Sequence, residues 1–212
     1  MDPIGTEAKR LSIIVIEDNP GDYILIEDYL IEKFQAIKIK QFTDYYSVSE
    51  YLQNTENICD LILLDLNLPD MGGLELVNNI LAISSRVPVI ILTGYADLFL
   101  AKRSLGLGVY DFLVKDEINP ALLHKSIEFA ISRNGYVRQI ESQNEKLKKI
   151  AWTQSHMVRA PLAKILGIIN VIEENQEKLE DIYFWLKHLR TSTNEMDEMV
   201  KKIVNEAQIL NK

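Results

Sequence analysis

Several side chains that are able to do chemistry follow directly after short apolar runs. Glu17 and Asp18 follow LSIIVI, Asp65 follows LILL, Thr93 follows VIIL, and Lys115 follows VYDFLV. Carboxylates that lie close together repel one another unless a cation holds them, and oxygen ligands with positions left for water and phosphate suit Mg²⁺. A hydroxyl and an ammonium beside such a cation would bind an anion. If the fold brings these residues together, they predict a divalent-metal site for phosphoryl transfer.

The apolar runs themselves predict a parallel sheet. Residues 11–16, 61–64 and 89–92 lack polar alternation, as expected of strands covered on both faces, and residues 109–114 complete the set. Residues 37–42 alternate, which suits an edge strand. Segments with helical spacing lie between the runs, so the pattern predicts an α/β fold with a doubly wound parallel sheet. In such sheets chemistry sits at the carboxyl ends of the strands, where the polar residues lie.

Residues 10–133 resemble the response-regulator receiver domain, which has a flavodoxin-like (βα)5 fold. The motifs that carry the resemblance are IEDNPGD, LLDLNLPDMGGLEL, ILTGYAD and YDFLVKD. The resemblance implies that Asp65 is the phosphoacceptor and that Mg²⁺ is the cofactor. It implies that Asp18 binds the metal directly with Asp65, that Glu17 supports it, and that Asn67 contributes its backbone carbonyl.

The same resemblance assigns three further residues. Thr93 and Lys115 would bind the phosphoryl oxygens, and Phe112 would be the aromatic switch residue that swings inward when Thr93 moves. Transfer through a loose transition state needs chiefly positioning and charge stabilisation, which a metal and a lysine supply. Asp116 departs from the family, which usually has proline after the lysine. The approach of Lys115 is therefore in question, although we expect the chemistry to persist.

From Val137 onward the apolar residues recur with a period of seven. The a and d positions of the first series are Val137, Ile140, Asn144, Leu147, Ala151, Gln154, Val158, Pro161, Ile165, Ile168 and Ile172. After EENQEK, the second series is Leu179, Ile182, Leu186, Leu189, Thr193, Met196, Val200, Ile203, Ala207 and Leu210. Apolar residues beside the stripe widen it: Ile169, Tyr183, Met199 and Val204. The pattern predicts a helical hairpin that forms a dimeric four-helix bundle, and hence a homodimer through residues 137–210.

His156 falls at heptad position f, so we expect it to face solvent. The surrounding segment, KIAWTQSHMVRAPLAKILGII, resembles the dimerisation and histidine phosphotransfer (HisKA-like) domain of sensor histidine kinases. A proline inside an apolar helix otherwise costs ~3 kcal/mol, so its presence supports the match. The resemblance implies that His156 is a phosphohistidine, whereas His124 and His188 have no comparable context. The residues that match the family's H-box are Ser155, His156, Arg159, Pro161 and Leu162.

Two positions near His156 differ from the kinase pattern. The family has an acidic general base directly after the histidine, where this chain has Met157, and a Thr or Asn one turn later, where it has Ala160. An ATP-binding domain would add ~100 residues or more, and the sequence has no Gly-rich phosphate loop. We therefore expect no autonomous ATP-dependent histidine kinase.

Composition indicates an ordinary globular protein with two unlike parts. The chain has 212 residues, 47% of them hydrophobic and 25% charged, with a formal net charge of −8. Residues 1–133 hold 20 acidic and 11 basic side chains, whereas residues 134–212 hold 11 and 12. The sequence has no basic patch that would predict nucleic-acid binding. It also has no apolar run near the length that a membrane-spanning helix needs. The polar N-terminus and the single cysteine, Cys59, favour a cytoplasmic protein without a disulfide.

These observations predict a tail at residues 1–9, a receiver domain at 10–133 and a helical phosphotransfer-like domain at 134–212. The favoured function is a two-component phosphorelay protein that accepts phosphate on Asp65 and regulates, or exchanges phosphate with, the domain carrying His156. Expected partners are a cognate histidine kinase and other receiver or phosphotransfer proteins. In one alternative the helical bundle is a non-catalytic dimerisation or output module. In another the chain is a fragment of a hybrid histidine kinase.

Overall fold

The computed structural model describes residues 10–54, 57–84, 86–174 and 179–209. The chain divides into two compact units, Met1–Gln139 and Ile140–Lys212. The boundary lies slightly beyond the one predicted at residue 134, because a single helix continues through that point.

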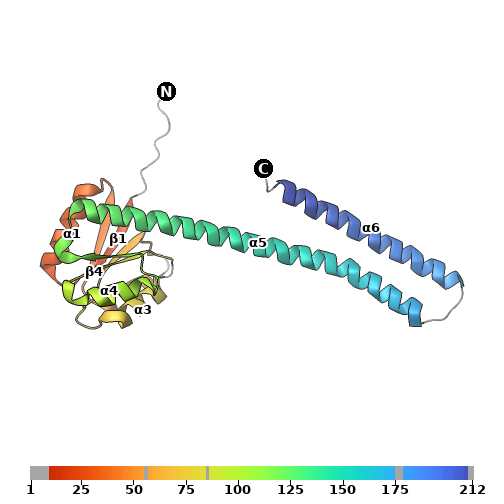
Figure 1. Ribbon diagram of the computed structural model, residues 1–212, viewed down its shortest axis with the longest axis horizontal. Coiled ribbons are helices and arrows are strands. Elements are labelled where there is room, and N and C mark those ends of the chain that lie inside the picture. The colour runs from red at the N-terminus through yellow and green to blue at the C-terminus, as the bar shows by residue number, and fades with distance from the viewer. Residues whose placement is uncertain (1–9, 55–56, 85, 175–178, 210–212) are drawn as a thin grey trace, which may run out of the picture. The chain divides into compact units, whose positions relative to one another are not determined.

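The first unit alternates strands and helices (Figure 1). Its strands are β1 (Leu11–Ile16), β2 (Ile37–Phe42), β3 (Leu61–Asp65), β4 (Val89–Thr93) and β5 (Asp111–Val114). Its α-helices are α1 (Pro20–Lys33), α2 (Tyr45–Gln53), α3 (Gly73–Ile83), α4 (Leu98–Leu105) and the first part of α5 (Pro120–Glu174). Two 3₁₀ turns, η1 (Tyr95–Asp97) and η2 (Lys115–Glu117), follow β4 and β5.

The strands form one parallel sheet in the order β2-β1-β3-β4-β5. The strand order reverses between β1 and β3, so the loops after these two strands leave toward opposite faces and open a crevice at the carboxyl edge. Asp65 ends β3 and Thr93 ends β4, while Glu17 follows β1 and Lys115 follows β5. The topology confirms the predicted receiver-type sheet and brings these residues to one edge.

Alternate residues of each strand pack against helices on opposite faces of the sheet, as the covered apolar runs predict. On one face, Ile14, Ile16, Ile62 and Leu64 pack with Val48 of α2, Leu76 of α3 and Ala101 of α4. On the other face, Ile13, Val15, Leu61 and Leu63 pack with Ile26 and Leu30 of α1 and with Leu123 and Ile127 of α5. The residues at the carboxyl edge therefore follow or end strands β1, β3 and β4, whose last residues are buried.

The start of helix α1 lies next to the carboxyl edge of the sheet. The Asn19 side chain accepts hydrogen bonds from the backbone N–H groups of Gly21 and Asp22, and Pro20 occupies the first turn. An Asn cap followed by proline is a strong start signal, because it satisfies free N–H groups and fixes the backbone. The cap places Asp22 in the first turn of α1, next to the acidic edge.

Helix α5 continues through Asn134 and Gly135, the first two residues of the predicted helical domain. The Asn134 side chain accepts a hydrogen bond from Tyr110 Oη at 2.9 Å and donates one to the Arg86 carbonyl at 3.0 Å. Gly135 is exposed, and a glycine in a helix costs only about 1 kcal/mol. This cost is too small to end the helix.

The second unit consists of the rest of α5 and of α6 (Leu179–Ile209). The later predicted seam positions of α5 are buried or half-buried: Val158, Pro161, Ile165, Ile168 and Ile172. The earlier ones, Ile140, Leu147 and Ala151, are exposed. Lys164 of α5 and Glu195 of α6 form an ion pair at 3.4 Å, so the two helices pack side by side.

The less exposed face of α6 differs from the predicted stripe. It contains Trp185, Leu189, Ser192, Met196, Met199 and Ile203. Leu189, Met196 and Ile203 were predicted, but Leu186, Thr193 and Val200 are exposed. The predicted side chains of Gln154, Leu179, Ile182, Val204 and Ala207, and Leu210 itself, lie outside the described residues. Helix α6 thus carries a second apolar stripe that the hairpin leaves uncovered.

Within the described residues, α5 is the helix that is long and apolar enough to cross a membrane by length and composition alone. No membrane-spanning segment was expected from the sequence. A helix of a soluble protein can pass the same test, so the finding shows the apolar character of α5 and no more.

Candidate functional site

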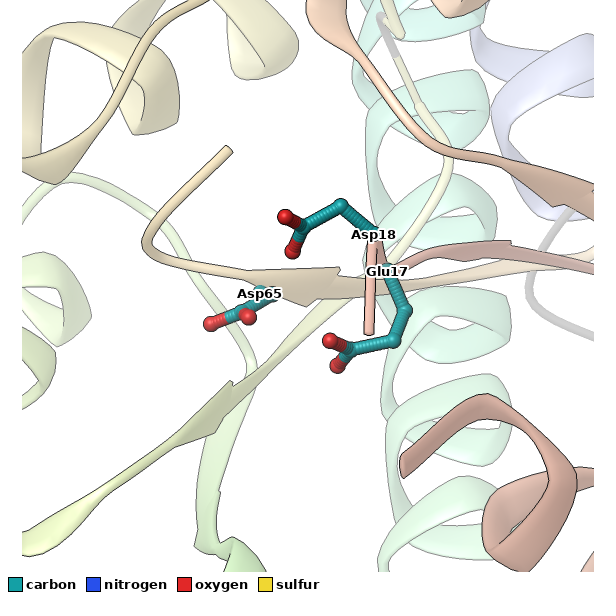
Figure 2. Close-up of side chains that lie close together, drawn as sticks. All are labelled: Glu17, Asp18 and Asp65. Atoms are coloured by element: carbon teal, nitrogen blue, oxygen red, sulfur yellow. The ribbon is translucent and has the colours of Figure 1, made fainter. Parts of the chain in front are cut away.

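Asp65 lies at the carboxyl end of β3, with Glu17 and Asp18 beside it (Figure 2). Asp65 is buried with 7% of its surface exposed, Glu17 is completely buried, and Asp18 is exposed. Each of these residues offers one carboxylate oxygen, and these oxygens lie within 4.8 Å of one another. The three carboxylates form a cluster with one open side.

Glu17 is the residue whose burial most affects its ionisation. Desolvation raises its pKa to about 7, even though contact with Lys115 acts in the opposite direction. Its Oε2 atom lies 2.7 Å from Lys115 Nζ and has no other partner among the described residues. Glu17 therefore depends on a nearby cation to stay charged near neutral pH.

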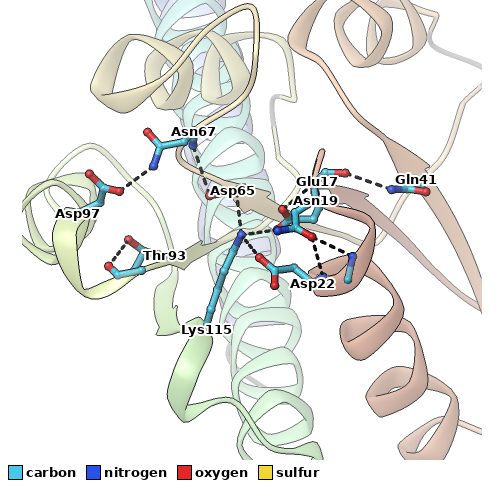
Figure 3. Close-up of polar contacts among 11 residues, drawn as sticks. Glu17, Asn19, Asp22, Gln41, Asp65, Asn67, Thr93, Asp97 and Lys115 are labelled. Atoms are coloured by element: carbon cyan, nitrogen blue, oxygen red, sulfur yellow. Dashed lines mark hydrogen bonds and ion pairs between the residues drawn. The ribbon is translucent and has the colours of Figure 1, made fainter.

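Lys115 supplies that cation and joins three acids (Figure 3). Besides Glu17, its Nζ lies 2.8 Å from Asp22 Oδ2 and 2.8 Å from Asp65 Oδ2. Burial alone would lower the pKa of Lys115, but the hydrogen bonds to Asp22, Asp65 and Glu17 raise it above its ordinary value. The ammonium is thus charged at any physiological pH, donates hydrogen bonds to Asp22 and Asp65, and forms an ion pair with Glu17.

The loops after β3 and β4 are tied to each other beside Asp65. The Asn67 backbone N–H donates to Asp65 Oδ1 at 3.3 Å, and its side-chain amide donates to Asp97 Oδ2 at 2.7 Å. Thr93 is buried, and its hydroxyl donates to the Gly94 carbonyl at 3.1 Å. Tyr95 Oη donates to Glu117 at 2.6 Å, which links η1 to η2. These bonds set the rim around Asp65.

Most residues predicted for the edge meet there. Glu17, Asp18, Asp65 and Lys115 form the acidic cluster and its counter-ion, and Asn67 bonds to Asp65 through its backbone. Phe112 of β5 is half-buried against the core on the α2, α3 and α4 face. Its role as a switch stays a prediction.

The donor set fits Mg²⁺. Magnesium prefers oxygen ligands and keeps several waters, so a site with a few carboxylates and an open side suits it. The converging oxygens of Glu17, Asp18 and Asp65 meet this description. The buried Glu17 Oε2, which has only Lys115 as a partner among the described atoms, adds negative charge that a metal would neutralise.

Asp22 is a member of the site that the sequence reasoning missed. It is part of the motif IEDNPGD and sits one turn after Asp18, in the first turn of α1. Its contact with Lys115 joins residues 93 positions apart. The position was visible in the sequence as an acid at a helix start on the active edge, but that signal usually indicates only a favourable helix dipole.

His156 lies in the second unit, on the part of α5 that follows Gln139. Its side chain is exposed, as predicted, and its ring lies 4.2 Å from the Trp152 ring, centroid to centroid. His124 instead contacts Phe34 and Glu128, and His188 contacts Phe184. Met157 and Ala160 are exposed as well.

Comparison with known proteins identifies the first unit. The family model described as "Response regulator receiver domain" matches residues 13–128, which is more than half of the chain. A signal receiver domain from Vibrio parahaemolyticus has a TM-score of 0.53 and 26% identity, over 62% of this chain and 98% of that one. The receiver domain of a Pseudomonas aeruginosa sensor histidine kinase, with magnesium in its active-site cleft, has a TM-score of 0.50 and 26% identity over 58% of this chain and 98% of that one.

Curated relatives carry different names beyond this domain. A cyclic di-GMP phosphodiesterase of Thermotoga maritima is 26% identical over 79% of this chain and 45% of its own length. The transcriptional regulatory protein MalR of Bacillus subtilis is 24% identical over 95% of this chain and 87% of its own. The chain thus spans less than half of the first of these relatives. The family model matches more than half of the chain, and the matched residues include the whole acidic edge. The chain therefore belongs to the response regulator receiver domain family.

Proposed function

We propose that the first unit is a Mg²⁺-dependent phosphoacceptor that takes a phosphoryl group on Asp65. The observation that carries the proposal is the contact of Lys115 Nζ with Asp65 Oδ2 at 2.8 Å, within a cluster of carboxylates fit for a metal. The magnesium recorded in the Pseudomonas receiver domain supports it.

In the proposed reaction an Asp65 carboxylate oxygen forms a bond to phosphorus while the bond between phosphorus and the donor's leaving group breaks. The leaving group departs with the electron pair of that bond. Asp18 and Asp65 would hold Mg²⁺ with the Asn67 carbonyl, and Glu17 would support them. The metal, when bound, offsets charge on the phosphoryl oxygens.

The protein's own groups have two tasks in this step. Lys115 offsets negative charge on the transferred group, which is the main requirement of a loose transition state. The Thr93 hydroxyl would exchange its bond to the Gly94 carbonyl for one to a phosphoryl oxygen, and Phe112 would follow it inward. The buried strands β3 and β4 would hold the backbone at Asp65 and Thr93 while the Thr93 side chain changes its partner.

Beryllofluoride, which mimics a phosphoryl group on aspartate, tests the proposal. With Mg²⁺ present, it should shift the backbone NMR signals of Thr93, Phe112 and Lys115 in the wild type. The Asp65→Asn variant should show no such shifts. Unchanged spectra in a folded wild-type protein would contradict phosphoacceptance at Asp65.

We further propose that His156 exchanges phosphate with a receiver aspartate, because its imidazole is exposed and flanked by Trp152. Such exchange needs mainly an accessible imidazole and the receiver's metal site, so Met157 and Ala160 do not forbid it. Incubation with a phosphorylated receiver should give acid-labile, base-stable phosphate. His156→Gln should abolish it, while the control His188→Gln should not.

Absence of phosphohistidine would favour the rival proposal, in which the helical unit is a non-catalytic dimerisation or output module. That rival is supported by relatives whose printed names describe a phosphodiesterase and a transcriptional regulator. A third possibility is a hybrid histidine kinase whose ATP-binding part lies outside these residues. The length of the coding sequence beyond residue 212 distinguishes it.

The second unit is proposed to form a homodimer, because apolar side chains on both helices are exposed: Ile140, Leu147, Leu166, Leu186 and Val200. A second copy would cover these side chains through a closed two-fold interface. The cognate histidine kinase, the cytoplasmic location and the lack of nucleic-acid and membrane contacts remain proposals from the sequence.

A further inference from the structure

Lys115 contacts three carboxylates, and one of them, Asp22, has no part in the proposed reaction. Its Nζ donates hydrogen bonds to Asp22 Oδ2 and Asp65 Oδ2, both at 2.8 Å, and forms an ion pair with Glu17 Oε2 at 2.7 Å, so three carboxylates surround the ammonium at hydrogen-bond distance. An ammonium has three donors and no more. If a phosphoryl oxygen is to receive one of them, a present partner has to give it up.

The three partners differ in how well water can replace Lys115. The Glu17 side chain is 0% exposed, and its Oε2 has no second partner among the described residues. The Asp65 side chain is 9% exposed and carries the reacting atoms, whereas the Asp22 side chain is 37% exposed. Leaving a buried carboxylate unpaired is costly, but an exposed one is readily hydrated. Asp22 is therefore the partner that Lys115 can release at least cost.

The surroundings of Asp22 also leave room for its release. Asp22 and Lys115 line a pocket of about 240 Å³ together with Leu25, Ile26 and Tyr29 of α1. A carboxylate that turns away from Lys115 finds space for water on this side. The backbone of Asp22 stays fixed by the Asn19 cap, so only the side chain has to move.

We propose that Asp22 is a positioning residue that holds Lys115 while Asp65 is free and competes with the phosphoryl group for it. This inference rests on the proposed function of Asp65. The competition weakens phosphoryl binding and slows phosphorylation, so it sets the threshold for activation. Within the described part of the chain, the polar contacts of Asp22 are with Lys115 and the Asn19 cap, so Asp22 acts through Lys115.

The test is a beryllofluoride titration at saturating Mg²⁺, followed through the NMR signals of Thr93 and Lys115. Asp22→Ala should bind beryllofluoride about three- to ten-fold more tightly than the wild type, because a charge-assisted contact no longer has to be broken. Asp22→Asn, which keeps a neutral acceptor, should lie in between. Phosphorylation by acetyl phosphate should accelerate in the same order.

The matched control is Asp28→Asn, which removes the same charge from an exposed position on α1. Its affinity for beryllofluoride should stay within about two-fold of the wild-type value, since salt screens the charge of an exposed side chain. Thermal melting of each variant reports whether it folds. A gain in affinity is not a result that structural damage produces.

The outcomes separate the two proposals. If the wild type binds no beryllofluoride, the function proposed for Asp65 fails. If the wild type binds but Asp22→Ala binds equally or more weakly, Asp22 does not compete for Lys115 and this inference is overturned. If Asp28→Asn gains as much affinity as Asp22→Ala, the effect is one of general charge, and the inference is overturned as well.

Discussion

At the scale of single residues, the acidic edge is held together by one cation. Lys115 contacts three carboxylates, and one of them, Glu17, is completely buried. The arrangement orients Asp65 before any metal or phosphoryl group arrives, which is how a preorganised site lowers a barrier. Its cost is a buried acid whose ionisation depends on pH.

Glu17 makes that cost measurable in metal-free protein. Its pKa is raised to about 7 by burial, so between its ordinary pKa and 7 the folded state holds a proton that the unfolded chain has lost. Stability should therefore fall as pH rises through this window and change no further above it. In Glu17→Gln this part of the pH dependence should vanish, a difference of at least about 1 kcal/mol in unfolding free energy.

Denaturant unfolding with a chelator present, at a series of pH values from 4.5 to 8, measures this effect. The control Glu50→Gln removes an exposed acid of α2 and should follow the wild-type curve. Parallel curves for wild type and Glu17→Gln would show that Glu17 does not titrate in this range.

At the scale of elements, the two glycines Gly73 and Gly135 offer a direct test of how the chain enters and continues its helices. Gly73 begins α3 with a φ of +63°, a conformation that side chains rarely adopt, next to the loop that carries Asn67. Gly135 lies in the middle of α5, and a Cβ added there would meet no atom within 4 Å. One glycine is required by the backbone and the other is not.

Gly135→Ala should accordingly stabilise the protein by about 0.5–1 kcal/mol, because alanine loses less entropy in a helix. Gly73→Ala should destabilise it by about 1 kcal/mol or more, since the left-handed conformation is strained for alanine. Thermal melting of both variants measures the contrast. A loss of stability in Gly135→Ala would mean that α5 is not continuous at this point.

The sequence was sufficient for the strands and for most of the acidic edge, because covered strands and the residues that end them follow from local apolar runs. It was insufficient where opposing effects are small or contacts are distant. The domain boundary predicted at residue 134 falls inside a continuous helix, where the bonds of Asn134 to Tyr110 and Arg86 outweigh a glycine penalty of about 1 kcal/mol. The contact between Asp22 and Lys115 joins two distant segments, and no local pattern encodes it.

The less exposed face of α6 differs from the predicted stripe for another reason. Both stripes on this helix are apolar and share Leu189, Met196 and Ile203, so the period of seven does not decide which stripe faces α5. Trp185 and Ser192 lie on the less exposed face of the helix, whereas Leu186 is exposed. Helix periodicity thus predicts an apolar face but not its partner.

At the scale of the whole molecule, the exposed stripe of α6 bears on assembly. Leu186 is 52% exposed and Val200 is 42% exposed. If a second copy covers them, Leu186→Glu should weaken dimerisation at least ten-fold, because burying a leucine contributes about 1.5–3 kcal/mol. Sedimentation across a concentration series measures the effect.

Asn194→Glu is the control for this change, since it adds the same charge at an exposed position of α6 outside the stripe. It should leave the dimer intact. A monomeric wild type at all accessible concentrations, or equal effects of both variants, would contradict a homodimer through this face.

The central claim is that Asp65 receives a phosphoryl group. Mass spectrometry after incubation with acetyl phosphate and Mg²⁺ tests it most directly, with peptide fragmentation to locate the modified residue. The account predicts one added phosphoryl group on Asp65, none without Mg²⁺, and none in Asp65→Asn. A folded wild-type protein that stays unmodified, or that carries the group on another residue of the acidic edge, would contradict it.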